Sequence, residues 1–152
     1  MLADFERALA DVLGARLPPP LAGAVDVVPG RDVARLLVSV GRVEPLDGAL
    51  HALHARRGER VPGAPAARRV LRLQGEVTLA LRAPDAEARP ARMDAFDDTL
   101  YLLGDPALAD GTALLPADAS DPGFLVHALR LVRAEPPTTV VLAGGGVFWP
   151  GG

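Results

Sequence analysis

The chain has 152 residues and a mass of 15.8 kDa, which fits one domain of ordinary size. Its net charge of -3 and isoelectric point near 5.6 argue against a general electrostatic attraction to nucleic acid or to an anionic membrane. The absence of cysteine excludes disulfides, thiolate metal sites and thiol nucleophiles. Hydrophobic residues make up 49% of the chain and aromatic residues only 4%, so we expect a core of Leu, Val and Ala.

The first 45 residues predict one helix and two strands. Apolar residues recur every three or four positions from Leu2 to Leu17, which indicates an amphipathic helix that ends at the prolines 18–20. The short stretch Ala24 to Val28 predicts an edge strand, and Arg35 to Glu44 predicts a longer one that Pro45 ends. The sequence has no signal-peptide pattern at its start and no long uncharged apolar run, so we expect neither secretion by that route nor a membrane-spanning helix.

A long polar connection precedes the clearest strand of the chain. The connection covers about residues 46–67 and is rich in Gly, Pro and Arg, and some of it, around Ala49 to Ala55, has helical character. Within the strand Arg69 to Arg82, the odd positions from Leu71 to Leu81 are apolar apart from Gly75, and most even positions are polar, namely Arg72, Gln74, Glu76, Thr78 and Arg82. This alternation places one face on a core and the other in water or against a polar partner. Gly75 interrupts the apolar row, which indicates a bulge or a close approach by another element.

The second half of the chain predicts a helix, a loop and a hairpin. Apolar residues at helical spacing predict a helix from Ala91 to Leu103, and residues 107–122 are predicted to form a loop. Two apolar stretches, Phe124 to Glu135 and Thr138 to Ala143, predict a pair of strands. In the first of these strands, alternation assigns Phe124, Val126, Ala128 and Val132 to one face. The fold class that we expect is α+β: two layers, an antiparallel or mixed sheet of four to five strands, and two helices packed on one face.

The sequence offers few residues for catalysis or metal binding. His51 and His54 have a permitted ligand spacing but stand in an Arg-rich segment, and His127 sits in a strand where a half-buried structural role is favoured. The aspartates of the helix 91–103 fit a solvated face better than a pair of catalytic carboxylates. The glycines 144–146 lack the pattern of a phosphate-binding loop, and they fit a place where backbones crowd. We therefore expect no catalytic residue, no metal and no cofactor.

Two groups of residues stand out as candidates for an interface. Six of the 16 arginines fall within residues 56–72, a group for which a solvated loop, a nucleic-acid contact and a charged protein interface remain open. The absence of interleaved aromatic residues disfavours nucleic acid. Phe148 and Trp149 either anchor a partner or cover the core of the subunit itself. The candidate interface residues are Arg56, Arg57, Arg60, Arg69, Arg72, Gln74, Glu76, Phe148 and Trp149.

The order of the predicted elements resembles that of the tail terminator proteins of long-tailed phages and of the cap proteins of phage-tail-like contractile injection particles. The resemblance rests on the helix ending at Leu17, the strand 35–44 with a long excursion after it, the strand 69–82, the helix 91–103 and the hairpin 124–143. It covers nearly the whole chain, residues 1–152, as one domain of that type. The Arg-rich connection and the end at 144–149 match no signature of the family.

The resemblance implies a structural protein without catalytic residues. Six copies are expected to form a ring on the last ring of a tail tube and to stop its polymerisation, and in contractile systems the ring also meets the sheath. Assembly would take place in the cytoplasm as part of a phage tail or a tail-like particle, with partners that are copies of the chain, the tube protein and the sheath protein, but no membrane. The alternative is a monomeric or dimeric α+β adaptor domain that binds a protein partner or a small ligand.

Overall fold

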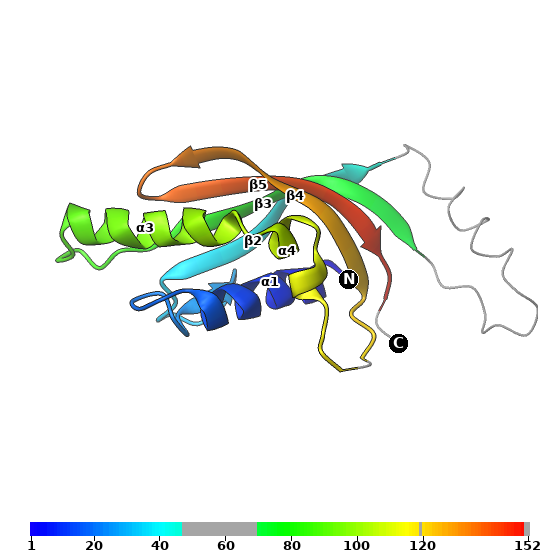
Figure 1. The fold of residues 1–152 in the computed structure, drawn as a ribbon, viewed down its shortest axis with the longest axis horizontal. Coiled ribbons are helices and arrows are strands. Elements are labelled where there is room, and N and C mark those ends of the chain that lie inside the picture. Colours follow the sequence, from blue (N-terminus) through cyan, green and yellow to red (C-terminus); the bar gives the residue numbers. More distant parts are fainter. Residues whose placement is uncertain (47–69, 119, 151–152) are drawn as a thin grey trace, which may run out of the picture.

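A computed structural model describes residues 1–46, 70–118 and 120–150. The Arg-rich connection 46–67, with the candidate residues Arg56, Arg57 and Arg60, lies outside these residues apart from Leu46, and so does Arg69, the first residue of the predicted strand 69–82. The chain forms an α+β fold, as the sequence predicts (Figure 1). Its elements are α1 (Leu2–Arg16), β1 (Val25–Val27), β2 (Leu36–Pro45), β3 (Leu71–Leu81), α3 (Arg89–Leu103), α4 (Pro106–Ala109), the 3-10 helix η1 (Thr112–Leu114), β4 (Phe124–Glu135) and β5 (Thr139–Phe148).

The five strands form one mixed sheet with the order β1-β2-β3-β5-β4. The strands β1 and β2 run parallel, whereas the β2–β3, β3–β5 and β5–β4 pairs are antiparallel. The hairpin of β4 and β5 is closed where the amide of Thr138 donates to the carbonyl of Glu135 over 2.8 Å. The predicted edge position of the first strand is confirmed, and the twelve-residue β4 occupies the opposite edge.

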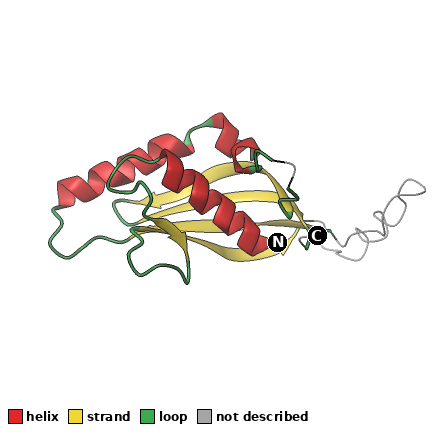
Figure 2. Cartoon of the chain, turned by 90° about the horizontal axis from the view of Figure 1, so that it is seen from below, coloured by secondary structure: helices red, strands yellow, loops and turns green. Residues whose placement is uncertain are grey.

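Both long helices lie on the same face of the sheet. Figure 1 shows the sheet curving over α1 and α3, and Figure 2 shows the two helices in front of the strands when the molecule is seen from the helical side. The amphipathic pattern of α1 explains its position, because Phe5, Leu9 and Leu13 are all buried. On α3 the fully buried Phe96 performs the same role. The sheet face away from the helices carries no other element of the described structure.

Three phenylalanine rings at one end of the core join α1 to the hairpin. Phe5 meets the ring of Phe124 at a centroid distance of 5.7 Å and the ring of Phe148 at 6.2 Å, both edge to face. This geometry is favourable for aromatic pairs. Phe148 is 5% exposed, so it belongs to the core of its own chain, as one of the two sequence interpretations holds.

The structure extends the last strand beyond its predicted end. Residues 144–148, which include the three glycines, continue β5 to Phe148 instead of forming a separate tail. A Cβ atom on Gly146 would lie 2.6 Å from the carbonyl oxygen of Leu125, and one on Gly75 would lie 2.3 Å from that of Arg42. Both glycines therefore stand where backbones crowd, and Gly75 faces an irregularity in β2 between Val40 and Val43.

The predicted faces of β4 are wrong beyond His127. The pairing with β5 shifts between His127 and Arg130, where Ala128 has a φ of 56°, and shifts again between Leu131 and Arg133. Each β-bulge adds a residue and reverses the alternation of side chains. Leu129 therefore packs against the core in place of Ala128. The region predicted as a loop, 107–122, also contains most of α4 and all of η1.

Candidate interface on the uncovered sheet face

The sheet face opposite the helices, here called the outer face, gathers polar side chains from four strands. The even positions of β3 point this way, because the odd residues Leu73, Val77 and Leu79 are buried on the helical side. Strand pairing then fixes the neighbouring rows. The outer face consists of Ser39, Arg42, Glu44, Arg72, Gln74, Glu76, Thr78, Leu125, His127, Arg130, Arg133, Val141, Ala143, Gly145 and Val147.

An open hollow of about 410 Å³ lies in the middle of the outer face. The hollow forms there because Gly145, which pairs with Gln74 across β3 and β5, presents no side chain on this face. Longer side chains stand around it on both sides. Its lining residues are Arg42, Glu44, Leu46, Gln74, Gly75, Glu76, His127, Ala128, Arg130, Ala143, Gly144 and Gly145.

Charges of both signs surround this hollow. Arg42 and Glu44 come from β2, Glu76 from β3 and Arg130 from β4. The side-chain amide nitrogen of Gln74 on β3 donates to the carboxylate of Glu44 on β2 at 3.4 Å. This hydrogen bond joins side chains of two neighbouring strands. The outer face therefore offers cations and carboxylates a few residues apart, an arrangement that suits a partner surface of equally mixed charge.

The described residues of the hollow do not assemble a catalytic or metal site. Across residues 1–46, 70–118 and 120–150, no three His, Asp or Glu side chains come close enough to hold a metal ion. His127 is exposed rather than half-buried as the sequence suggested, because its position on β4 turns it to the outer face. The same described ranges contain no helix long and apolar enough to cross a membrane.

The structure brings together three of the predicted interface residues and separates the other two. Arg72, Gln74 and Glu76 share the outer face through their even positions on β3. Phe148 is buried on the helical side, and the indole nitrogen of Trp149 donates to Asp121 at 2.6 Å. The remaining predicted residues, Arg56, Arg57, Arg60 and Arg69, lie outside the described structure.

Among the residues of the hollow that sequence reasoning missed are its four ionisable residues outside β3, namely Arg42, Glu44, His127 and Arg130. The alternation of β3 alone does not reveal which strands flank it. The signal that was present is Gly145 in the run 144–146, because a strand position without a side chain leaves a depression on its face of the sheet.

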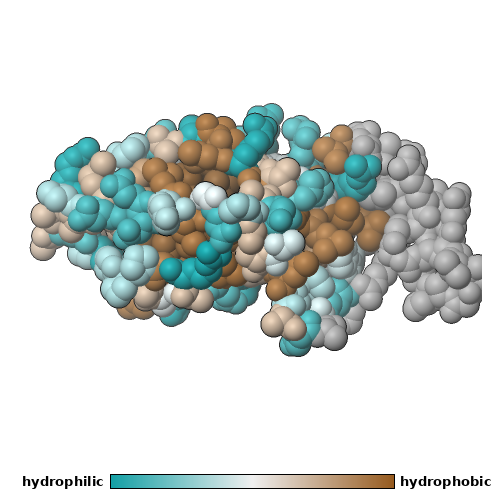
Figure 3. Space-filling model, in the orientation of Figure 1, coloured by the Kyte–Doolittle hydropathy of each residue, from teal (hydrophilic) through white to brown (hydrophobic). Residues whose placement is uncertain are grey.

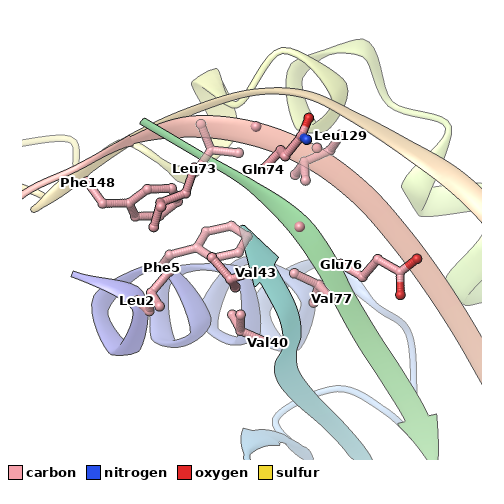
Figure 4. A pocket seen from close by; sticks show the side chains of 14 residues that line it. Leu2, Phe5, Val40, Val43, Leu73, Gln74, Glu76, Val77, Leu129 and Phe148 are labelled. Carbon is pink, nitrogen blue, oxygen red and sulfur yellow. The ribbon is translucent and has the colours of Figure 1, made fainter. Parts of the chain in front are cut away.

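A second cavity, on the inner side of the sheet, is too small for a ligand. It holds about 30 Å³ and is walled by apolar side chains such as Leu2, Phe5 and Val43. In Figure 4 the side chains of Gln74 and Glu76 point away from these apolar groups. A space of this size holds about one or two water-sized probes, whereas pockets for small molecules span roughly 300–1,000 Å³.

The face of the molecule that is seen in the orientation of Figure 1 has no single broad apolar patch. Figure 3 shows apolar patches that polar side chains separate from one another. Exposed apolar residues are nevertheless present at the β4 edge, where Leu125 is 49% exposed and Leu131 is 53% exposed. Leu125 belongs to the outer face, and Leu131 pairs with the core residue Leu142 on the helical side.

Comparisons with models of protein families, with curated proteins and with solved structures find no match for this chain.

Proposed function

We propose that the chain is a structural subunit that forms a ring of about six copies and caps the tube of a phage tail or a phage-tail-like contractile particle. The observation that carries the proposal is the outer face, a full sheet face without a covering helix in the described structure. The order of helices and strands, which resembles that of tail terminators and particle caps, supports the same function.

The outer face has the chemistry that contact with a second copy requires. Ring subunits meet through two different patches of the same chain, so a surface with both signs of charge can find complementary groups on its neighbour. Arg42 and Arg130 supply cations, and Glu44 and Glu76 supply carboxylates. The hollow above Gly145 can receive a side chain that projects from the neighbouring copy.

The edge strand β4 adds backbone groups to this surface. A strand at the edge of a sheet has one row of N–H and C=O groups without a strand partner, and such edges pair readily with another chain. The two bulges in β4 twist this edge and confine regular pairing to short stretches. Leu125, exposed beside this row, provides apolar area that a neighbour would cover.

The adaptor alternative remains the second candidate, because a domain that binds one protein partner would use the same outer face without forming a ring. The small-ligand form of that alternative would need one of the open hollows, since the apolar inner cavity of about 30 Å³ has no room for a metabolite.

The functional test is the length of tail tubes assembled in the presence of the chain. The tube protein from the same genome is polymerised with and without the chain, and tube lengths are measured by electron microscopy. We expect shorter tubes with a ring visible at one end. The variant Glu76→Arg is expected to lose this effect, because a reversed charge disrupts the outer face.

The matched control is Asp97→Arg, which makes the same change of charge at an exposed position of α3, on the helical side. Both variants must retain the circular dichroism spectrum of the native chain. Tubes of unchanged length with the native chain would argue against a capping function, and equal activity of the two variants would argue against the outer face.

A further inference from the structure

Another hollow, separate from the outer face and from the inner cavity, lies at the end of the molecule where α3 begins, on the left of Figure 1. It has a volume of about 220 Å³ and shares no residue with the hollow of the outer face. The ends of β2 and β3, the start of α3 and the β4–β5 turn all contribute to its walls. The residues that line it are Leu21, Arg35, Leu81, Arg82, Ala83, Glu87, Arg92, Ala95, Pro137 and Thr138.

This hollow is strongly cationic in a chain whose net charge is negative. Three of its lining residues are arginines, and Glu87 is the one carboxylate among them. Glu87 is already engaged, because its carboxylate accepts from the Nη2 atom of Arg35. The positive end of the α3 dipole adds to this potential, since the helix begins at Arg89, between Glu87 and Arg92 in the chain.

Two of these arginines have donors that find no acceptor among the described residues. Within the described ranges, the buried side-chain nitrogen and oxygen atoms that lack a hydrogen-bond partner are the Nε of Arg35 and the Nε of Arg92. Both belong to the same hollow. A buried donor of a charged group that lacks an acceptor is costly, so native structures rarely retain one without a reason.

Several arginines elsewhere in the described structure donate hydrogen bonds to carboxylates of the same chain. Arg7 and Arg31 both donate to Asp26, and Arg16 donates to Asp105. The shortage is therefore specific to the hollow at the start of α3. Guanidinium groups bind phosphate and carboxylate oxygens with a geometry that matches their planar fork.

We propose that this hollow is a binding site for an oxyanion, held by the guanidinium groups of Arg35, Arg82 and Arg92. The ligand is a free phosphate or a carboxylate, and its oxygens supply acceptors that the described residues do not. The inference is independent of ring formation, because no residue of the outer face contributes to the site.

The test is a titration of the chain with inorganic phosphate, with sodium chloride of equal ionic strength as the reference. Nuclear magnetic resonance follows the arginine Nε–H signals, and thermal unfolding follows stability. We expect saturable shifts of the Arg92 and Arg35 signals and a rise in Tm that chloride does not reproduce. A parallel titration with acetate separates the two ligand sources, because the natural class of oxyanion is expected to saturate the site at the lower concentration.

The variants Arg92→Gln and Arg82→Gln are each expected to weaken the binding about tenfold or more, since each removes a charge-assisted contact. Arg82 is exposed, so its replacement leaves the fold intact. The matched control Arg133→Gln removes an exposed arginine from the outer face and should leave the titration unchanged. The proposal is overturned if neither anion gives a saturable shift, or if all three variants bind alike.

Discussion

Arg7 on α1 and Asp26 on β1 form a hydrogen-bonded ion pair in which the Nη2 atom of Arg7 lies 2.5 Å from the Oδ1 atom of Asp26. The carboxylate is only 5% exposed and also accepts from the amides of Val27 and Arg31 at 2.8 Å. The Nε atom of Arg31 completes the set at 3.1 Å. A single buried carboxylate therefore ties α1, the edge strand β1 and the turn after it to one another.

Replacement of Asp26 by Asn should lower the Tm of the chain by several degrees. The amide keeps the size of the side chain but removes the charge that strengthens four hydrogen bonds, and it replaces one of the two acceptor oxygens with an NH2 group that cannot accept. The matched control is Asp11→Asn, which removes the second and more exposed partner of Arg7, at 3.7 Å. Thermal unfolding measures both variants, and equal Tm values for the two would contradict the importance of Asp26.

Acid should destabilise the native chain more steeply than the Asp26→Asn variant. The amide of Arg31, followed by the side chain of Arg7, holds the pKa of Asp26 far below its ordinary value of 3.8. Because the folded state has the lower pKa, its contribution to stability is present above about pH 5 and is lost progressively as the pH falls toward the folded value. We expect the difference in Tm between the two proteins to shrink from pH 6 to about pH 2, and a constant difference would exclude this linkage.

Two neighbouring glycines of β5 should respond very differently to alanine. A Cβ on Gly146 would lie 2.6 Å from a backbone oxygen of β4, whereas the closest atom to a Cβ on Gly145 is 3.4 Å away. Gly146→Ala should therefore cost about 1–3 kcal/mol of unfolding free energy through overpacking, and Gly145→Ala much less. Urea unfolding measures both. A similar loss for the two variants would show that the crowding between β4 and β5 does not require a glycine at 146.

Phe148 should act as a core residue rather than as an anchor for a partner. Its ring packs edge to face on Phe5, and the residue is almost fully buried. Phe148→Ala should lower the unfolding free energy by about 3–5 kcal/mol, as truncations of buried aromatic residues do. The control is Leu125→Ala at an exposed position of β4, which should leave stability nearly unchanged. A stable Phe148→Ala chain that loses only its partner would support the anchor interpretation instead.

Strict periodicity allowed much of the fold to be predicted from the sequence. The helical stripe that begins at Leu2 and the alternation of residues 69–82 each depend on a single element, so local spacing was sufficient. The hairpin was also recognisable, because Pro136 and Pro137 separate two apolar stretches. The helices cover one face of the sheet because the apolar side of each element has only one place to be buried.

The features that the sequence did not reveal arise from contacts between distant elements. The bulge at Ala128 depends on how β4 fits β5, and no local pattern marks a non-glycine residue with a positive φ. The sequence indicated that backbones crowd at the glycines 144–146, but their role as strand residues follows from pairing with both β3 and β4. The hollow of the outer face is likewise a product of four strands, so only its β3 residues were foreseen.

The central claim is that the outer face joins copies of this chain into a ring, and the mass of the purified protein in solution tests it most directly. Native mass spectrometry at micromolar concentration, with and without the tube protein, counts the copies. We expect a closed species with a mass near six times the 15.8 kDa of the single chain. This species should be absent from the Glu76→Arg variant and present in the Asp97→Arg variant. A protein that stays a monomer in both conditions would contradict the account.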